Sequence, residues 1–354
     1  MEERIMNPAE LTLDEMERWL REEDDRKLEE LWEAADRTRR EHVGDAVHLR
    51  GLIEISNYCV RQCGYCGLRS DHHGLQRYRM TEEEIMACVG RAVEFGYGTV
   101  VMQSGEDYGI LAPWLAGVIR RIKTETSLAV TLSLGERLDH ELELWRNAGA
   151  DRYLLRFETS DAELYNLIHP ALADRRFDRL EILHTLRRLG YEVGSGVMIG
   201  IPGQSYRILA KDIDMFRRLD LDMIGVGPYI SHPCTPLGQG DSTSSLPPDE
   251  QVPNTERMTY KVMALTRLVC PQANIPSTTA LATLDRDNGR ELGLQRGANV
   301  VMPNLTPPQY RVLYEIYPDK ACVHETAEAC CGCLGARIAA LDRFVGTGPG
   351  GRLR

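Results

Sequence analysis

Three cysteines on one short segment are the residues of this chain best suited to chemistry. Cys59, Cys63 and Cys66 are spaced C-x3-C-x2-C in I-S-N-Y-C-V-R-Q-C-G-Y-C-G-L-R, directly after a strand-like run. Three thiolates on one loop can hold three irons of a 4Fe-4S cube and leave the fourth iron open. The spacing therefore predicts an iron-sulfur site with one coordination position that the protein does not fill.

A structural zinc loop is the alternative interpretation of these cysteines. Zinc sites usually bring two ligand pairs or a Cys/His set. No second C-x2-C follows nearby in the sequence, and His72 and His73 could only complete an irregular site. The spacing favours the iron-sulfur interpretation.

Composition narrows the class of protein. The chain has 354 residues, enough for one large domain or two, and a net charge of −11, which gives no general electrostatic reason to bind nucleic acid or an anionic membrane. The polar N-terminal residues lack a signal-peptide core, and no apolar run is long enough to span a bilayer, so we expect a cytoplasmic protein. Ten cysteines in such a chain indicate metal ligands and buried thiols rather than disulfides.

Regular alternation of β-rich and helical segments predicts the scaffold. After a charged, helix-periodic extension over residues 1–47, in which Thr12 and Glu15 form a capping box, eight β-rich runs alternate with amphipathic stretches. The runs are His48–Ser56, Thr99–Gly105, Ala129–Gly135, Arg152–Glu158, Glu192–Gly200, Met223–Ile230, Asn274–Ala280 and Ala298–Asn304. Parallel strands need crossover helices, so we predict an α/β fold with a complete (β/α)8 TIM barrel over residues 48–320, followed by a cysteine-containing segment over 321–354. A doubly wound open sheet is the alternative.

Polar residues cluster where these runs end. Functional groups of (β/α)8 barrels lie at the carboxyl ends of the strands. The strand ends carry Gln103, Ser104, Gly105, Glu106, Ser133, Arg156, Glu158, Met198, Thr278 and Thr279. A ring of such ends around the cysteine loop predicts one shared site.

At this level of detail the chain resembles the HydE-type maturases of FeFe-hydrogenase, in the biotin-synthase-like branch of the radical SAM superfamily. The resemblance runs from about Gly51 to Cys333. It rests on the cysteine segment together with Q-S-G-E-D, V-T-L-S-L-G-E, D-R-Y-L-L-R-F-E-T, I-P-G-Q, G-V-G-P-Y-I-S-H-P, I-P-S-T-T-A and G-A-N-V-V-M-P-N-L-T-P, in that order.

The resemblance implies an activity. A 4Fe-4S cluster would chelate S-adenosylmethionine, cleave it reductively and release a 5'-deoxyadenosyl radical, used in assembly of the di-iron site of the hydrogenase H-cluster. It also implies a small organometallic or amino-acid-derived substrate, namely a cysteine-bearing iron carbonyl cyanide species. Transient contact with other hydrogenase maturases and an electron donor is expected as well.

The resemblance further implies roles for individual residues. Gln103, Ser104, Gly105 and Glu106 would form the edge that receives the methionine ammonium, Ser133 and Glu158 the ribose contacts, Arg179 the carboxylate contact, and Met198 the adenosyl packing. Arg156, Thr278, Thr279, Tyr314 and Tyr317 would line an anion- and substrate-binding cavity. From the residues alone, Arg179 could be a helix-surface salt bridge and Met198 plain core. An inward Arg156 is more informative, because a buried guanidinium needs an anionic partner.

Cys322, Cys330 and Cys333, spaced C-x7-C-x2-C, match a second Fe-S site found in part of the family. We expect such a site to lie away from the barrel mouth, and simple thiols or an oxidised state remain as alternatives.

Two other functions are compatible with the motifs. Methylornithine synthase, a related radical SAM mutase acting on lysine, has the same barrel but lacks the terminal cysteine pattern. An Fe-S scaffold that delivers a cluster without radical chemistry is the non-enzyme alternative, and the ring of polar strand ends argues against it.

Overall fold

The computed structural model describes residues 11–173, 177–241 and 246–352, without the side chains of residues 329–331. The strands are β1 (Ala46–Ser56), β2 (Thr99–Ser104), β3 (Ala129–Ser133), β4 (Arg152–Leu154), β5 (Glu192–Ile199), β6 (Met223–Pro228), β7 (Val300–Val301) and β8 (Phe344–Val345). The helices are α1 (Leu13–Arg21), α2 (Asp25–Val43), α3 (Glu82–Glu94), α4 (Ala112–Glu125), α5 (Asp139–Asn147), α6 (Ala162–Ile168), α7 (Arg179–Arg188), α8 (Tyr206–Arg218), α9 (Glu256–Val269), α10 (Thr279–Leu284), α11 (Gly289–Gln295), α12 (Pro308–Arg311) and α13 (Ala327–Ala339), with a 3-10 turn η2 (Leu237–Gln239).

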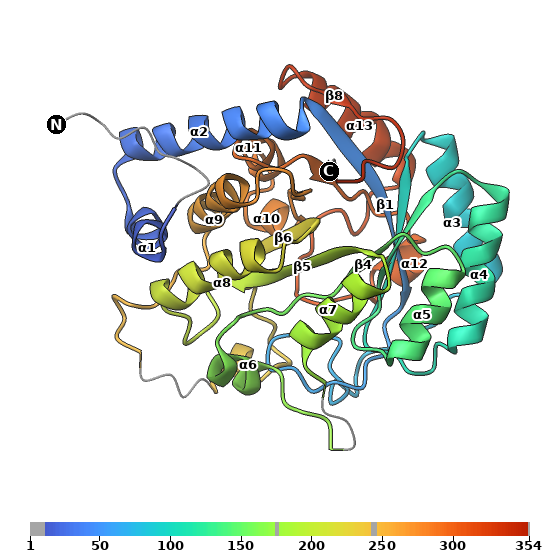
Figure 1. Ribbon diagram of the computed structural model, residues 1–354. Coiled ribbons are helices and arrows are strands. Elements are labelled where there is room, and N and C mark those ends of the chain that lie inside the picture. Colours follow the sequence, from blue (N-terminus) through green and yellow to red (C-terminus); the bar gives the residue numbers. More distant parts are fainter. Residues whose placement is uncertain (1–10, 174–176, 242–245, 353–354) are drawn as a thin grey trace.

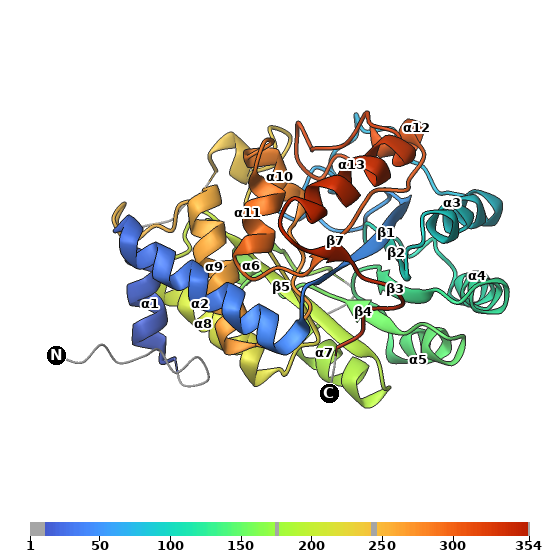
Figure 2. The ribbon, with the colours of Figure 1, turned by 90° about the horizontal axis from the view of Figure 1, so that it is seen from above.

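The strands form a curled parallel sheet in the order β6-β5-β4-β3-β2-β1-β7, with β8 paired to the start of β1. Figure 2 shows the strands at the centre and the helices around them. The helices that follow the strands bury an apolar face, as in α4, where Leu115, Ile119 and Ile122 are buried. This arrangement brings the carboxyl ends of the strands to one end of the barrel-like wall.

The predicted α/β architecture is confirmed, but a complete eight-stranded barrel is not. The predicted strand Asn274–Ala280 consists only of isolated bridges, from Asn274 to Met223 and from Pro276 to Val300. The chain then turns into α10, because the Thr278 side chain accepts a hydrogen bond from the Leu281 N–H and caps the helix. The β-branched threonines that suggested a strand therefore begin a helix.

The strand boundaries differ most at the fourth run. β4 ends at Leu154, although the prediction continued to Glu158, which makes only an isolated bridge to Val197. β7 is likewise confined to two residues. Short strands leave irregular backbone at the carboxyl ends, where the polar residues lie.

The N-terminal helices cover one side of the wall, as Figure 1 shows beside α8 and α9. α1 packs on α8 and α2 on α9. The predicted capping box is present, with the Thr12 N–H donating to Glu15 (2.9 Å) and the Glu15 N–H donating to the Thr12 hydroxyl (3.2 Å). Across the described ranges, every helix is too short or too polar to cross a membrane.

The glycine-rich segment after β8 crosses the amino ends of the strands. Its Pro349 carbonyl accepts hydrogen bonds from Thr99 (2.9 Å) and Arg152 (3.0 Å), and its Gly350 carbonyl accepts one from Arg50 (2.9 Å). This segment, for which the sequence predicts no helix or strand, therefore closes the wall at the end opposite the cysteine loop.

Candidate active site

The cysteine loop follows β1 and lies at the carboxyl end of the sheet. Cys63 is buried, and Cys59 and Cys66 are half-buried. Burial, together with the neighbouring Cys59, raises the pKa of the Cys63 thiol to about 12, and burial also raises the pKa of Cys66. Thiolates packed this closely need a positive charge beside them. Three converging thiols therefore fit an iron-sulfur cluster as their donor set.

Gly105 allows the loop to approach the end of β2. A Cβ at this position would clash with the Tyr58 carbonyl oxygen and contact Cys59. The adjacent backbone is tied to the loop, because the Val60 N–H donates to the Glu106 carbonyl (3.0 Å). Gly105 supports the cysteines from behind and does not line the cavity.

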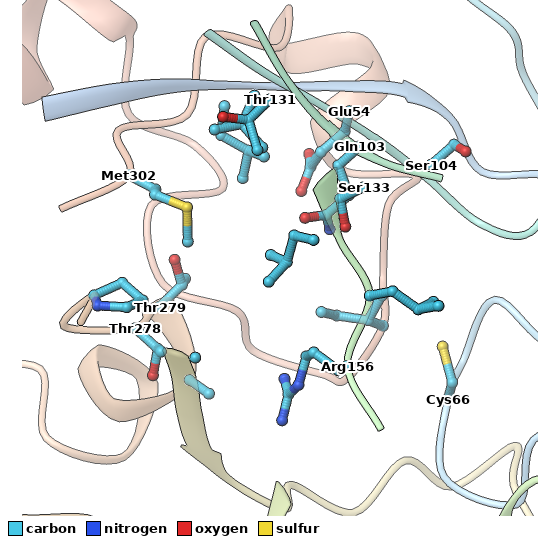
Figure 3. A pocket seen from close by; sticks show the side chains of 18 of the residues that line it. Glu54, Cys66, Gln103, Ser104, Thr131, Ser133, Arg156, Thr278, Thr279 and Met302 are labelled. Atoms are coloured by element: carbon cyan, nitrogen blue, oxygen red, sulfur yellow. The ribbon is translucent and has the colours of Figure 1, made fainter. Parts of the chain in front are cut away.

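A cavity of about 330 Å³ extends from the cysteine loop into the sheet. Its wall includes most of the residues predicted from sequence. They are Cys59, Cys63, Cys66, Gln103, Ser104, Glu106, Ser133, Arg156, Glu158, Arg179, Thr278, Thr279, Tyr317 and Cys322. Figure 3 shows Gln103, Arg156 and Thr278 around this one space, although they come from separate parts of the chain.

Besides Gly105, the predicted residues Tyr314, Met198 and Cys333 lie outside the wall or behind it. Tyr314 is buried, and its hydroxyl accepts a hydrogen bond from Gln103 (3.2 Å), so it supports a wall residue. Met198 packs in a small apolar cluster that includes Leu237 and contacts Tyr65. Cys333 is exposed on α13, and the Cys330 side chain lies outside the described residues.

Cys322 borders the same cavity as Thr278. Its sulfur accepts a hydrogen bond from Arg290 (3.2 Å). The C-terminal cysteine segment therefore reaches the central cavity at Cys322, whereas the sequence predicts a site away from the barrel mouth.

Arg156 and Glu158 form the polar part of the wall beyond β4. Arg156 Nη2 and Glu158 Oε2 form an ion pair at 3.2 Å without hydrogen-bond geometry, and the buried Nε atom of Arg156 has no hydrogen-bond partner among the described residues. Such atoms are costly unless a ligand satisfies them. A carboxylate oxygen accepts from hydroxyl groups, so Glu158 fits a ribose diol, and Arg156 fits an anion.

Two predicted cofactor contacts are already engaged by protein groups. Glu106 accepts from Arg61 (2.7 Å) and from Tyr108 (2.9 Å). Arg179 donates from Nε to Glu136 (2.8 Å) and from Nη1 to the Arg156 carbonyl (2.6 Å). Sequence reasoning assigned no role to Arg61 or Glu136, although Arg61 lies within the cysteine segment and Glu136 ends the segment V-T-L-S-L-G-E.

A buried ion pair in the wall was also missed. Lys320 donates to Glu54 (2.7 Å), and the other Glu54 oxygen accepts from Asn304 (3.0 Å). Glu54 lies within the apolar run G-L-I-E-I-S of β1. A carboxylate inside a buried strand is rare unless it is paired, and that signal could have identified it.

Comparisons with known proteins agree with this geometry. Residues 53–216 match the model of the radical SAM superfamily. The chain is 46% identical over 330 residues to the [FeFe] hydrogenase maturase subunit HydE of Thermotoga maritima, covering 92% of this chain and 89% of that protein. It is 26% identical to 3-methylornithine synthase of Methanosarcina acetivorans, over 84% of this chain and 81% of that protein.

Solved structures support the fold. The crystal structure of methylornithine synthase (PylB) superposes with a TM-score of 0.77 at 24% identity, covering 95% of this chain and 94% of that one. HydG, a maturase of the [FeFe]-hydrogenase, gives 0.69 at 21% identity, covering 84% of this chain and 65% of that one. With three cysteines in the cavity wall and this degree of identity over nearly the whole chain, the protein belongs to the HydE family of radical SAM enzymes.

Proposed function

We propose that this protein cleaves S-adenosylmethionine at a 4Fe-4S cluster and acts in assembly of the di-iron site of FeFe-hydrogenase. One observation carries the proposal: the three cysteines of one loop and the polar ends of β2, β3 and β4 border a single cavity. The identity to HydE supports the same assignment. When bound, the cluster would supply the electron that converts the cofactor into a 5'-deoxyadenosyl radical and methionine.

Cys59, Cys63 and Cys66 would hold the cluster, and the ends of the strands would hold the cofactor. Glu158 would accept from the ribose hydroxyls, with Ser133 beside it in the wall.

In this proposal the Glu106 carboxylate does not bind the methionine ammonium, whereas Arg179 keeps its predicted contact with the methionine carboxylate. The Glu106 carboxylate is used by Arg61, so the methionine ammonium would be received by Ser104 and by backbone carbonyls of this edge, beside Gln103. Arg179 has five N–H groups and uses only some of them on the protein, so it can also donate to the methionine carboxylate.

The substrate would lie deeper, between Arg156, Thr278, Thr279 and Tyr317, with Tyr314 supporting the wall through Gln103. The wall contains seven basic side chains and three acidic ones. This excess favours an anionic substrate, such as a cysteine-bound iron carbonyl cyanide complex, over lysine with its second ammonium group. Other hydrogenase maturases and an electron donor would be the transient partners.

We also propose a three-part organisation of the chain, with an extension over 1–47, a barrel over 48–320 and a cysteine segment over 321–354. Residues 274–276 would act as the closing strand, a role that the hydrogen bond from the Ile224 N–H to the Asn274 carbonyl (2.9 Å) supports. Cys322, Cys330 and Cys333 would hold a second Fe-S cluster in this segment.

The experiment is a substrate comparison. Anaerobically reconstituted, reduced protein is given S-adenosylmethionine with the iron complex, L-lysine or dethiobiotin, and 5'-deoxyadenosine is measured. We expect faster formation with the iron complex alone. Conversion of lysine to methylornithine would replace the maturase assignment, and stimulation by none of the three would refute the substrate class.

A further inference from the structure

A network of buried charged side chains lies beside the cysteine loop, and three of its members, Arg61, Glu136 and His169, have no part in the function proposed so far. Its members are Arg61, Glu106, Glu136, His169 and Arg179, which we call the loop network. Arg61, Glu106, Glu136 and His169 are each at most 4% exposed. The network comes from five separate places in the chain: the loop itself, the ends of β2 and β3, the end of α6 and the start of α7.

Arg61 connects the loop to the sheet. It lies between Cys59 and Cys63, and its guanidinium donates to Glu106 from Nε (2.7 Å) and to Glu136 from Nη2. The Glu106 carboxylate is also tied to the backbone beyond β3, because the Glu136 backbone N–H donates to it (3.1 Å). A planar fork held by two buried carboxylates fixes both the position and the rotation of the loop.

Glu136 also connects the cysteine loop to the backbone beyond β4, where the cofactor would bind. Its Oε1 atom accepts from Arg179 Nε (2.8 Å), and Arg179 also donates to the Arg156 carbonyl (2.6 Å). The Arg156 side chain in turn faces Glu158 at 3.2 Å. The cysteine loop and the backbone beyond β4 are therefore linked through two side chains, Glu136 and Arg179.

The same residues do not form a divalent-metal site. Ligand atoms of Glu106, Glu136 and His169 lie within 4.8 Å of one another, which is close enough to share an ion. However, Arg61 and Arg179 already neutralise the two carboxylates, and a cation would have to displace them. His169 contacts the Arg179 guanidinium through Nε2, and burial with the nearby arginines lowers its pKa to about 2, so it accepts as neutral imidazole.

We propose that Arg61 and Glu136 are positioning residues that hold the cluster loop in register with the cofactor-binding backbone beyond β4. The inference rests on the proposed function, since it assumes a cluster on the loop and S-adenosylmethionine beside it. Partners of a metal-binding shell change affinity by roughly 10–100-fold when mutated, which sets the scale of the expected effect.

The test uses Glu136→Gln and Arg61→Lys in the full chain. Glu136→Gln keeps the shape but removes the charge, and Arg61→Lys keeps the charge but loses the fork. The control is Gln62→Ala in the same loop, because Gln62 is exposed and its side chain donates to the nearby Asp71 (2.8 Å) and to no other group in the described part of the chain. Each reconstituted variant is measured for iron content, for the dissociation constant of S-adenosylmethionine by calorimetry, and for the change in the EPR spectrum of the reduced cluster on cofactor addition.

We expect both variants to fold and to bind the cofactor roughly 10-fold or more weakly, with a diminished spectral change, while the control matches wild type. A folded variant with lowered iron content would also support the proposal, since the loop would then be unanchored. Native affinity and spectra in both variants would overturn it, as would failure of both to fold, which would make the network a folding element. A stoichiometric non-iron metal lost in Glu136→Gln would overturn it as well.

Failure of the proposed function would look different from failure of this inference. In that case wild type and the Gln62→Ala control would themselves show no cofactor-dependent change in the EPR spectrum.

Discussion

We predict that the backbone of Glu158 is strained and that its carboxylate binds the cofactor. A matched pair of substitutions measures the two effects separately. The φ of Glu158 is 64°, in the left-handed region that L-residues rarely adopt. Its carboxylate is buried, and the Oε2 atom, 3.2 Å from Arg156 Nη2, makes no hydrogen bond among the described residues. Strain of this kind persists at binding sites when the surrounding structure imposes it. Here the Glu158 N–H donates to the Gly196 carbonyl (3.1 Å) and its carbonyl accepts from Met198 (3.2 Å).

Glu158→Ala and Glu158→Gly remove the same carboxylate and differ only in backbone freedom. The left-handed conformation costs an L-residue about 1–2 kcal/mol, and glycine loses about 0.5–1 kcal/mol more than alanine in conformational entropy on folding. We therefore expect the glycine variant to be more stable than the alanine variant by about 1 kcal/mol in urea unfolding of metal-free, reduced protein. Gly117, on an open helix surface, is the reference position, where alanine should be the more stable residue.

The affinity for S-adenosylmethionine should not follow the unfolding stability of the alanine and glycine variants. Both variants, and Glu158→Gln, should lose about 1–3 kcal/mol of S-adenosylmethionine binding because a desolvated acceptor of the ribose is removed or weakened. An alanine variant as stable as the glycine variant would refute the strain. Native cofactor affinity in all three variants would refute the placement of the ribose.

Three further predictions concern buried groups elsewhere. Burial raises the pKa of Asp212 to about 6, so its contribution to stability is full below the unfolded pKa and is lost as pH rises through 6. Relative to Asp212→Asn, the wild type should therefore lose about 1.4 kcal/mol between pH 5 and 7.5 in urea titrations, and parallel pH profiles would contradict this. Glu54→Gln should destabilise by about 3–5 kcal/mol, since it leaves Lys320 buried without its carboxylate, and equal stability in chemical denaturation would show that the pair is unimportant. Gly98→Ala should lower the melting temperature because its Cβ would clash with a carbonyl of the C-terminal segment, whereas Gly90→Ala, in open space on α3, should not; similar melts for the two would refute the packing of that segment.

The positions of the cysteines and of the first six strands could be predicted because they depend on local patterns. Spacing identifies Cys59, Cys63 and Cys66, and buried runs of period two or continuous apolar character identify strands such as β1. The ring of strand ends followed from the architecture, since parallel strands place their carboxyl ends on one side. That logic brought Arg156 and Thr278 to the same cavity in advance of the structure.

The parts that were missed depend on contacts between distant segments. Arg61 and Glu136 meet only after β1 and β3 are in place, and no periodicity marks them. The composition of the Asn274–Ala280 run predicts a strand, because threonines favour β-structure, but Thr278 is a helix cap, and capping outweighs propensity. Pro349 and its neighbours close the amino end of the sheet through carbonyl groups, which every residue has and which composition cannot reveal.

The central claim is that one cysteine loop holds the cluster at which S-adenosylmethionine is cleaved. The direct measurement is iron content together with 5'-deoxyadenosine formation in anaerobically reconstituted Cys59→Ser, Cys63→Ser and Cys66→Ser, with Cys234→Ser as the exposed-thiol control. We expect each loop variant to lose cofactor cleavage while Cys234→Ser retains it, because an open iron requires all three ligands of the loop. Undiminished 5'-deoxyadenosine formation by any of the three loop variants would contradict the account.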